Sequence, residues 1–326
     1  MPYKKKLLLL GSAAALLAII YILTFVFDPA ARNARSERFT WLPAASREEV
    51  DKIEIFHGRE KIELLFKYGS WFVVFGQLEI PARQGRVDDL FRLLSTRGAF
   101  PRRGSNAGSH EELGLDGTTR LVIRGGGGIP ILDLFIGNDD SAGQSVFLRK
   151  NGENEFRSGD RLIGTYVNGE INSWLNLRLF DEISVAHVQR VQINFVDYYG
   201  QSEDVSAYPY ESYTVSRSGE NWVIGSIVEK VKTENWIQTI LEAQGENILP
   251  VQRENSEALN DIFSVISIIR LELGNGSAIE LQIEKSREDD TYAAFVSGKP
   301  YMYILPQWTA VRLLRNRDYF INENGM

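Results

Sequence analysis

One pattern of glycine, tryptophan and β-branched residues occurs twice in the chain and limits what it can fold into. It reads KYGSWFVV at residues 67–74 and RSGENWVIG at residues 217–225. In each copy a glycine precedes a tryptophan by two or three positions, and residues that favour strands follow. The pattern predicts a strand, a tight turn and a second strand in each half of the chain.

The neighbouring segments repeat in the same order. VDKIEI at residues 50–55 matches VQRVQI at 188–193, and an amphipathic helix pattern at 86–98 matches another at 232–245. Six such elements recur along the two halves. This order predicts an internal duplication, with similar domains over residues 48–181 and 182–326.

Each copy combines strands joined by glycine turns with one or two amphipathic helices. An antiparallel sheet that buries one face needs a cover, and the helices would supply it. The sequence therefore predicts an α+β fold with two tandem domains, each an antiparallel sheet covered by helices. We expect Trp71 and Trp222 to lie in the two cores, and the alternative is that they stack on a ligand.

The N-terminal segment LLLLGSAAALLAIIYILTFVF, residues 7–27, contains no charged residue. At about 1.5 Å per helical residue it could cross a hydrocarbon layer of roughly 30 Å, so it predicts a transmembrane helix. A cleaved signal peptide is the alternative, but its apolar region is normally shorter. Lysines at 4, 5 and 6 favour a cytoplasmic N-terminus.

These features predict a single-pass protein of the cytoplasmic (inner) membrane that contacts lipid through residues 7–27. Residues 1–6 would form a cytoplasmic tail and residues 28–47 a linker. The two domains would then lie outside the cytoplasm.

Composition excludes several kinds of chemistry. The chain has no cysteine, which excludes disulfides, cysteine metal sites and a cysteine nucleophile. Beyond the first three lysines, 33 basic residues stand against 43 acidic ones. This balance argues against a nucleic-acid partner, which would require a basic face.

The sequence offers no catalytic motif. The histidines at 57, 110 and 187 are not at metal-ligand spacing, and no G-x-S-x-G nucleophile motif occurs. RGGGGIP at 124–130 lacks the G-K-[ST] of a phosphate loop, so we interpret it as a hairpin turn. We therefore predict no catalytic residue, no cofactor site, no metal site and no enzymatic activity.

Loops at 137–145 and 150–155 are rich in oxygen ligands but lack the order of a calcium-binding loop. The segment DYYGQSEDVSAYPYESY, residues 197–213, is an insertion in the second copy. It carries five tyrosines, which are the candidate interaction residues Tyr198, Tyr199, Tyr208, Tyr210 and Tyr213. Tyrosines are enriched at interfaces, but they could equally pack on their own domain.

The first copy resembles a family of bacterial envelope proteins that contain the domain of unknown function numbered 4340. The resemblance lies in VDKIEI, IELLFKYGSWFVV, RVDDLFRLLSTRG, LGLDGTTRLVIR and FIGN, and covers most of residues 48–181. It implies an envelope protein that often accompanies ABC transporter components, and it implies no catalytic residues. The second copy lacks the GL segment and carries the tyrosine-rich insertion.

Together these features predict a non-enzymatic, membrane-anchored accessory or scaffold subunit of a membrane complex. The resemblance alone makes an ABC-type transporter the expected partner. A second hypothesis is an extracytoplasmic module that binds envelope glycan or peptide. A third hypothesis is a hydrolase with two close carboxylates. No pair of acidic residues in the sequence has a spacing that indicates such a site.

Overall fold

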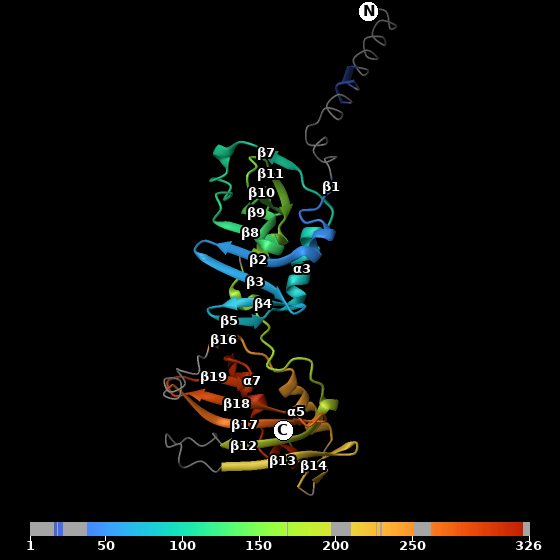
Figure 1. Ribbon diagram of the computed structural model, residues 1–326, viewed down its shortest axis with the longest axis vertical. Coiled ribbons are helices and arrows are strands. Elements are labelled where there is room, and N and C mark those ends of the chain that lie inside the picture. The colour runs from blue at the N-terminus through green and yellow to red at the C-terminus, as the bar shows by residue number, and fades with distance from the viewer. Residues whose placement is uncertain are drawn as a thin grey trace, which may run out of the picture. The chain divides into compact units, whose positions relative to one another are not determined.

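The computed structural model describes residues 16–17, 19–21, 38–167, 169–196, 210–225, 227–228, 230–250 and 262–321. Apart from the short segment Phe75–Leu78, which groups with the second unit, the chain divides into two compact units after Trp174. Each unit is built on one large antiparallel sheet, which we name sheet 1 and sheet 2 (Figure 1).

Within the described residues, sheet 1 has nine strands in the order β5-β4-β3-β2-β8-β9-β10-β11-β7. The strands are β2 (Val50–His57), β3 (Glu60–Lys67), β4 (Ser70–Phe75), β5 (Leu78–Pro81), β7 (Arg102–Gly104), β8 (Thr119–Gly125), β9 (Ile129–Asp139), β10 (Ser145–Lys150) and β11 (Phe156–Asp160). A short separate pair joins β1 (Arg38–Phe39) to β6 (Gly98–Ala99). The helices of this unit are α3 (Gln84–Ser95) and α4 (Leu162–Val167).

Sheet 2, over the same described part of the chain, also has nine strands, in the order β15-β14-β13-β12-β17-β18-β19-β20-β16. The strands are β12 (Val188–Val196), β13 (Tyr210–Ser218), β14 (Asn221–Ile224), β15 (Ile227–Val228), β16 (Asn247–Pro250), β17 (Phe263–Leu273), β18 (Ala278–Ser286), β19 (Tyr292–Val296) and β20 (Tyr301–Leu305). Its helices are α5 (Val231–Leu241), α7 (Gln307–Leu313) and α8 (Asp318–Ile321).

The two sheets have the same topology. Replacing each strand of sheet 1 by its counterpart along the chain gives the strand order of sheet 2. Their central pairs also share an irregularity, because the register shifts between Val50 and Lys52 in sheet 1 and between Val188 and Arg190 in sheet 2. This match makes Lys52 equivalent to Arg190, and residues of the two units can be compared position by position.

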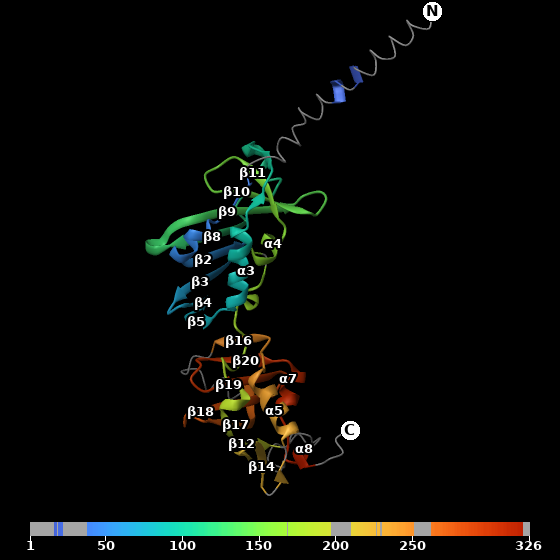
Figure 2. The ribbon, with the colours of Figure 1, turned by 90° about the vertical axis from the view of Figure 1, so that its right-hand side faces the viewer.

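A helix crosses each sheet from one edge to the other. In unit 1, α3 follows the edge strand β5 and leads to β7, which lies at the opposite edge. In unit 2, α5 connects β15 to β16 in the same way. Figure 2 shows each of these helices on one side of its own sheet. The crossover therefore covers one face of the sheet and also supplies its last strand.

The repeated glycine–tryptophan pattern forms a hairpin and a core anchor in each unit. Tyr68 and Gly69 both adopt positive φ, 54° and 78°, at the turn between β3 and β4, which is the geometry of a type I′ turn. After the turn, Trp71 is buried with its ring centroid 5.7 Å from that of Phe91 on α3. Trp222 is fully buried. The prediction that Trp71 and Trp222 are core residues is confirmed.

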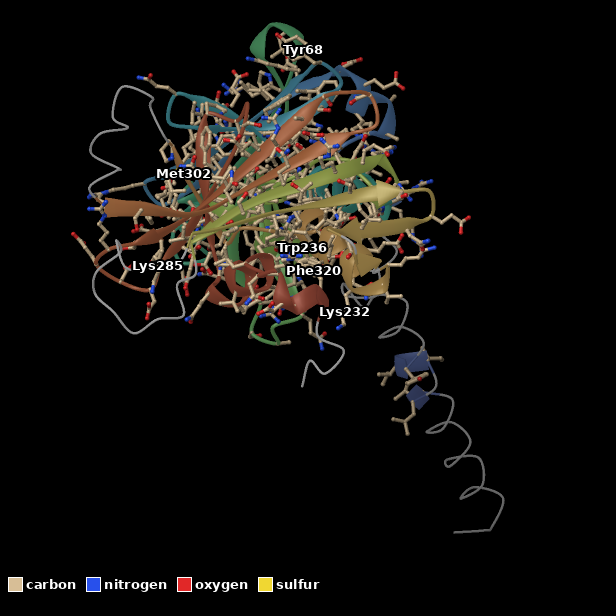
Figure 3. The ribbon with its side chains drawn as sticks, turned by 90° about the horizontal axis from the view of Figure 1, so that it is seen from below. Tyr68, Lys232, Trp236, Lys285, Met302 and Phe320 are labelled. Carbon is tan, nitrogen blue, oxygen red and sulfur yellow. The ribbon has the colours of Figure 1, made fainter. Side chains whose placement is uncertain are left out.

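The covering helices are held by apolar stripes that recur every three or four residues. On α3 the buried residues are Val87, Leu90, Phe91 and Leu94. On α5, Trp236 is buried with its ring centroid 5.2 Å from that of Phe320 on α8 (Figure 3), and its indole nitrogen donates to the carbonyl oxygen of Leu313 at 3.1 Å. The contact of Trp236 with Phe320 thus joins two helices, α5 and α8, of unit 2.

Each unit begins with an irregular segment that packs into its core. Trp41 and Leu42 are buried, and the amide of Leu42 donates to the carbonyl oxygen of Leu94 at 3.1 Å. Residues 38–47, interpreted as linker from the sequence, thus belong to unit 1. Leu179 makes the corresponding bond in unit 2, to the carbonyl oxygen of Ala243 at 3.0 Å. This packing places the boundary at 174/175, whereas the sequence suggested 181/182.

The fold-class prediction needs correction. Antiparallel strands are the main secondary structure of the described chain, and its helices are short. In unit 1 the helix α4 ends at Val167, and a single short turn at Ile171–Ser173 follows it. The residues after α4 include Gly169, which weakens helix continuation. The result is two units dominated by antiparallel sheet, rather than the predicted α+β fold with an N-terminal transmembrane helix followed by two tandem domains.

The predicted transmembrane helix and inner-membrane location are also corrected. None of the helices in the described residues is both long enough and apolar enough to cross a membrane. The longest, α3, carries Arg86, Asp88 and Asp89 among its 12 residues and buries only one stripe. Of the predicted span and lipid contact at 7–27, only residues 16–17 and 19–21 are described.

We expect Trp222→Ala to lower the free energy of unfolding by about 3–5 kcal/mol, because it leaves a cavity in a closed core. Tyr68→Ala is the matched control: this side chain is 97% exposed at its hairpin tip (Figure 3), so its loss should cost no more than about 0.5 kcal/mol. Urea denaturation followed by circular dichroism would measure both. Equal effects for the two variants would contradict the assignment of Trp222 as a core anchor.

Candidate functional site

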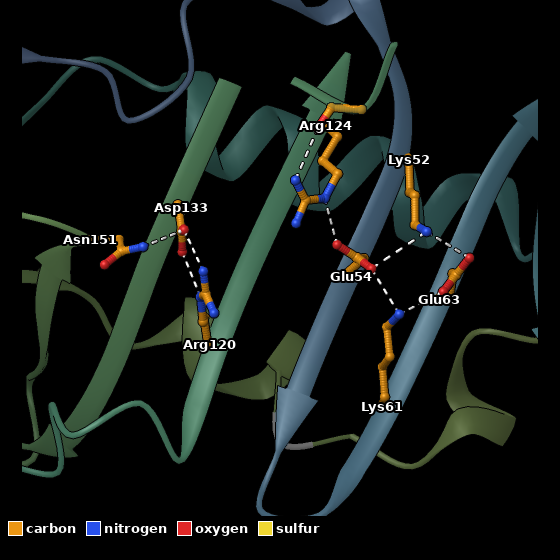
Figure 4. A network of polar contacts seen from close by, with 9 residues as sticks. Lys52, Glu54, Lys61, Glu63, Arg120, Arg124, Asp133 and Asn151 are labelled. Carbon is orange, nitrogen blue, oxygen red and sulfur yellow. Dashed lines mark hydrogen bonds and ion pairs between the residues drawn. The ribbon is translucent and has the colours of Figure 1, made fainter. Parts of the chain in front are cut away.

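The outer face of sheet 1, opposite α3, carries an ordered network of charges (Figure 4). Side chains alternate between the two faces of a strand. On β2, Ile53 and Ile55 are therefore buried on the inner face, while Lys52, Glu54 and Phe56 lie on the other. We name the polar outer surface of β2, β3, β8, β9 and β10 the charged face. Its members are Lys52, Glu54, Lys61, Glu63, Arg120, Arg124, Asp133 and Arg149, with Asn151 beside them.

Glu54 lies at the centre of the charged face. Its side chain is only 7% exposed and receives hydrogen bonds from Arg124 Nε at 2.6 Å and Lys61 Nζ at 2.8 Å. Lys52 Nζ lies 3.4 Å from the same carboxylate. Glu63 on β3 accepts from both lysines, at 2.8 Å from Lys52 and 2.7 Å from Lys61. Two carboxylates and three cations thus share one set of charge-assisted hydrogen bonds.

These contacts control the protonation of the two carboxyl groups. Burial alone would raise the pKa of Glu54, but the hydrogen bonds from Lys61 and Arg124 and the charges of both lysines outweigh it and lower the pKa to about 2. For Glu63 the burial effect is likewise outweighed by the hydrogen bonds from Lys52 and Lys61, so its pKa is lowered. Both carboxylates are ionised at neutral pH. They can accept hydrogen bonds there but do not supply a proton to a reaction.

A second ion pair extends the charged face across β8 and β9. Arg120 donates from two nitrogens to Asp133, at 2.7 and 2.5 Å, and the Asn151 amide donates to the same carboxylate at 2.8 Å. The Arg120 guanidinium lies 5.4 Å from the ring centroid of Phe135, and that of Arg149 lies 4.3 Å from it. The two arginines are therefore oriented by an aromatic ring as well as by hydrogen bonds.

The charged face carries a net positive charge. Five cationic side chains stand against three carboxylates, those of Glu54, Glu63 and Asp133. Apart from Glu54, the members of its ion pairs keep 16–41% of their side-chain surface exposed. The face can therefore contact a partner directly, and its geometry favours a broad negatively charged surface over a small enclosed ligand.

Sheet 2 provides an internal comparison, because its topology is the same. Gln192 occupies the position of Glu54, and Thr214 occupies that of Glu63. The described pairs on this face are Arg190–Glu272 at 3.5 Å and Arg270–Glu272 at 4.0 Å, both partly exposed. Since sheet 2 forms without the network, the topology does not require it. The charged face is a property of unit 1.

The tyrosine-rich candidate site is only partly described. Tyr198, Tyr199 and Tyr208 lie outside the described residues, and Tyr210 is described only as the backbone start of β13. Tyr213 is buried, its hydroxyl donates to the carbonyl oxygen of Arg315, and its ring centroid lies 6.0 Å from that of Phe320. This tyrosine packs within its own unit.

The histidines and loops considered from the sequence do not gather into one site. His57 contacts Thr119 at 3.1 Å, His110 contacts the Asn154 carbonyl at 3.0 Å, and His187 closes a short turn with Ser184. RGGGGIP connects β8 to β9, as expected of a turn. Among the residues that the structure describes, no three histidine or acidic side chains are placed to hold a metal ion.

Comparison with protein-family models, curated proteins and solved structures finds no match to this chain. The resemblance to the envelope family therefore stays a prediction. The charged face itself was missed from the sequence, where Lys52 and Glu54 indicated only the polar side of a strand. The alternation of charges in both VDKIEI and EKIEL could have suggested a cross-strand pair. The positions of Arg124 and Asp133 on the charged face depend on the register of β8 and β9, which these sequence patterns do not give.

We expect Glu54→Gln to lower the free energy of unfolding by about 1–3 kcal/mol at neutral pH, because three cations lose their shared carboxylate. A carboxyl group with a lowered pKa stabilises the fold above its ordinary pKa and loses that contribution as the pH falls. The difference between wild type and variant should therefore shrink below pH 4.5 and vanish near pH 2.

Denaturation at a series of pH values would measure this difference. Glu280→Gln is the control, since Glu280 is an exposed residue of β18 in unit 2, and it should change stability by no more than about 0.5 kcal/mol at any pH. A Glu54→Gln effect that is independent of pH would contradict the role assigned to the ionised carboxylate.

Proposed function

We propose that the protein is a non-enzymatic accessory or scaffold protein that binds a negatively charged surface of a protein partner through the charged face of unit 1. The observation that carries this proposal is the difference between two sheets of the same topology. One outer face holds a positively charged, hydrogen-bonded network around Glu54, and the other holds two weak ion pairs.

The internal order of the network favours recognition. Long charged side chains lose rotamer entropy when they bind a partner, and this loss is smaller when hydrogen bonds already hold them. Lys61 and Arg120 each contact a carboxylate while their heads remain partly exposed. Such a surface attracts a negatively charged partner and fixes its orientation. Subunits of an ABC-type transporter stay the expected partners, on the sequence resemblance alone.

Affinity purification of the full chain after mild crosslinking in its native cells tests the proposal. Lys52→Gln combined with Lys61→Gln removes two positive charges and should weaken retention of the partner by about tenfold. Arg190→Gln removes one positive charge from the equivalent face of unit 2 and should leave retention unchanged. Raising the ionic strength should release the partner from the wild type.

Thermal unfolding of both variants would show whether they remain folded. Equal retention by the two variants, or retention that is insensitive to salt, would contradict binding through the charged face. Recovery of the protein alone after crosslinking would contradict the scaffold function itself.

A further inference from the structure

One tryptophan differs from all the others in its exposure. All six tryptophans of the chain lie in described residues. Five are buried, with exposed fractions of 4% for Trp41, 7% for Trp71, 0% for Trp174, 0% for Trp222 and 2% for Trp236. The sixth, Trp308, is 65% exposed. The exposed indole therefore offers a large aromatic face to a ligand.

Trp308 lies in the first turn of α7, on the side away from the core. The same helix buries Thr309, Ala310 and Leu313. Arg312 follows Trp308 by one helical turn, and its guanidinium carbon lies 6.0 Å from the indole ring. The two side chains therefore form one surface, with an aromatic plane next to a fixed cation.

This surface borders a groove of about 400 Å³ within unit 2. Its lining comes from α7, from the end of α5 and from the connection to β16, and consists of Thr239, Glu242, Ala243, Gln244, Gly245, Pro306, Trp308, Thr309 and Arg312. A volume of this size lies in the range of small-ligand sites. The groove combines one aromatic ring with carboxylate, guanidinium, amide and hydroxyl groups.

The backbone around the groove is already hydrogen-bonded. The amide of Ala243 donates to Ile240 and its carbonyl accepts from Leu179, while the amide of Gly245 donates to Leu177. The groove therefore offers a ligand mainly side-chain groups. A peptide that adds a strand to a sheet edge depends on main-chain hydrogen bonds, which this lining does not supply.

One polar group in the lining has no partner. Thr309 is 5% exposed, and its buried Oγ1 makes no hydrogen bond within the described part of the protein. The accessible surface of this oxygen is below 1 Å², so the hydroxyl lies beneath the groove surface and is not among the groups that the groove offers to a ligand.

Among the described residues, the matching helix of unit 1 has different side chains at the positions of Trp308 and Arg312. The helix α4 buries Ile163 and Val167, four residues apart as Thr309 and Leu313 are, so Leu162 corresponds to Trp308 and Tyr166 to Arg312. There the Tyr166 ring lies 4.9 Å from the guanidinium carbon of Arg86 and is occupied by that contact. At this helix position, an exposed aromatic ring is found in unit 2 but not among the described residues of unit 1.

From these observations we propose that the groove beside Trp308 binds a neutral saccharide, with one sugar ring stacked on the indole. The aromatic face matches the apolar face of a pyranose ring, and Glu242, Gln244 and Arg312 offer the donors and acceptors that ring hydroxyls require. The charges of Glu242 and Arg312 cancel, which favours an uncharged ligand. This site is independent of the charged face in unit 1.

Titration of the full-length protein with maltohexaose, cellohexaose and hexa-N-acetylchitohexaose tests the proposal, with tryptophan fluorescence and calorimetry as readouts. We expect saturable binding of at least one of these, at concentrations no higher than about 10 mM, with a change in the emission of the exposed tryptophan. Trp308→Ala should weaken binding by at least about tenfold. Leu162→Ala, the matched change in unit 1, should leave binding unchanged.

Three results would overturn the proposal. One is the absence of saturable binding for all three oligosaccharides. Another is binding that Trp308→Ala and Leu162→Ala affect equally, because it would place the ligand elsewhere. The third is binding of a proline-rich peptide that depends on Trp308 when no oligosaccharide binds, which would assign the groove to a peptide. Circular dichroism of both variants would verify that they are folded.

Discussion

The need to cover one face of a wide sheet governs the structure of each unit. The inner faces of sheets 1 and 2 carry apolar side chains on successive strands, and burying them is the main source of stability. A single helix in each unit provides much of this cover, anchored by contacts such as that of Trp71 with Phe91. That helix connects one edge strand of the sheet to the other. It therefore covers the core and also leads the chain to the strand at the opposite edge.

Once the inner face is closed, the outer face and the helix ends can vary without changing the topology. In unit 1 the outer face carries a hydrogen-bonded charge network around Glu54. In unit 2, Gln192 occupies the position of Glu54. In unit 2, Trp308 is exposed beside a groove. At the matching positions of unit 1 lie Leu162 and Tyr166, whose ring contacts the guanidinium of Arg86. The two surfaces are therefore chemically different.

The sequence was informative wherever the signal was local. The alternation in VDKIEI, the glycine turn before Trp71 and the stripe on α3 predicted strands, hairpin and helix, because these patterns depend on neighbours within one element. It was uninformative where partners are distant. Strand β7 has three residues and no alternation, and its pairing with β11 depends on the crossover. The Glu54 network likewise depends on strand register, and the exposure of Trp308 depends on helix packing. The apolar N-terminal segment led to a membrane prediction that the described helices do not support.

Cross-linking of paired strands would test the edge-to-edge crossover most directly, because the chain has no cysteine of its own and each engineered pair is unambiguous. The pairs are Arg102→Cys with Arg157→Cys in unit 1, Asn247→Cys with Ile304→Cys in unit 2, and Leu65→Cys with Phe72→Cys as a hairpin control. The account predicts that mild oxidation forms an intramolecular disulfide in all three. A disulfide in the hairpin control but in neither crossover pair would contradict it.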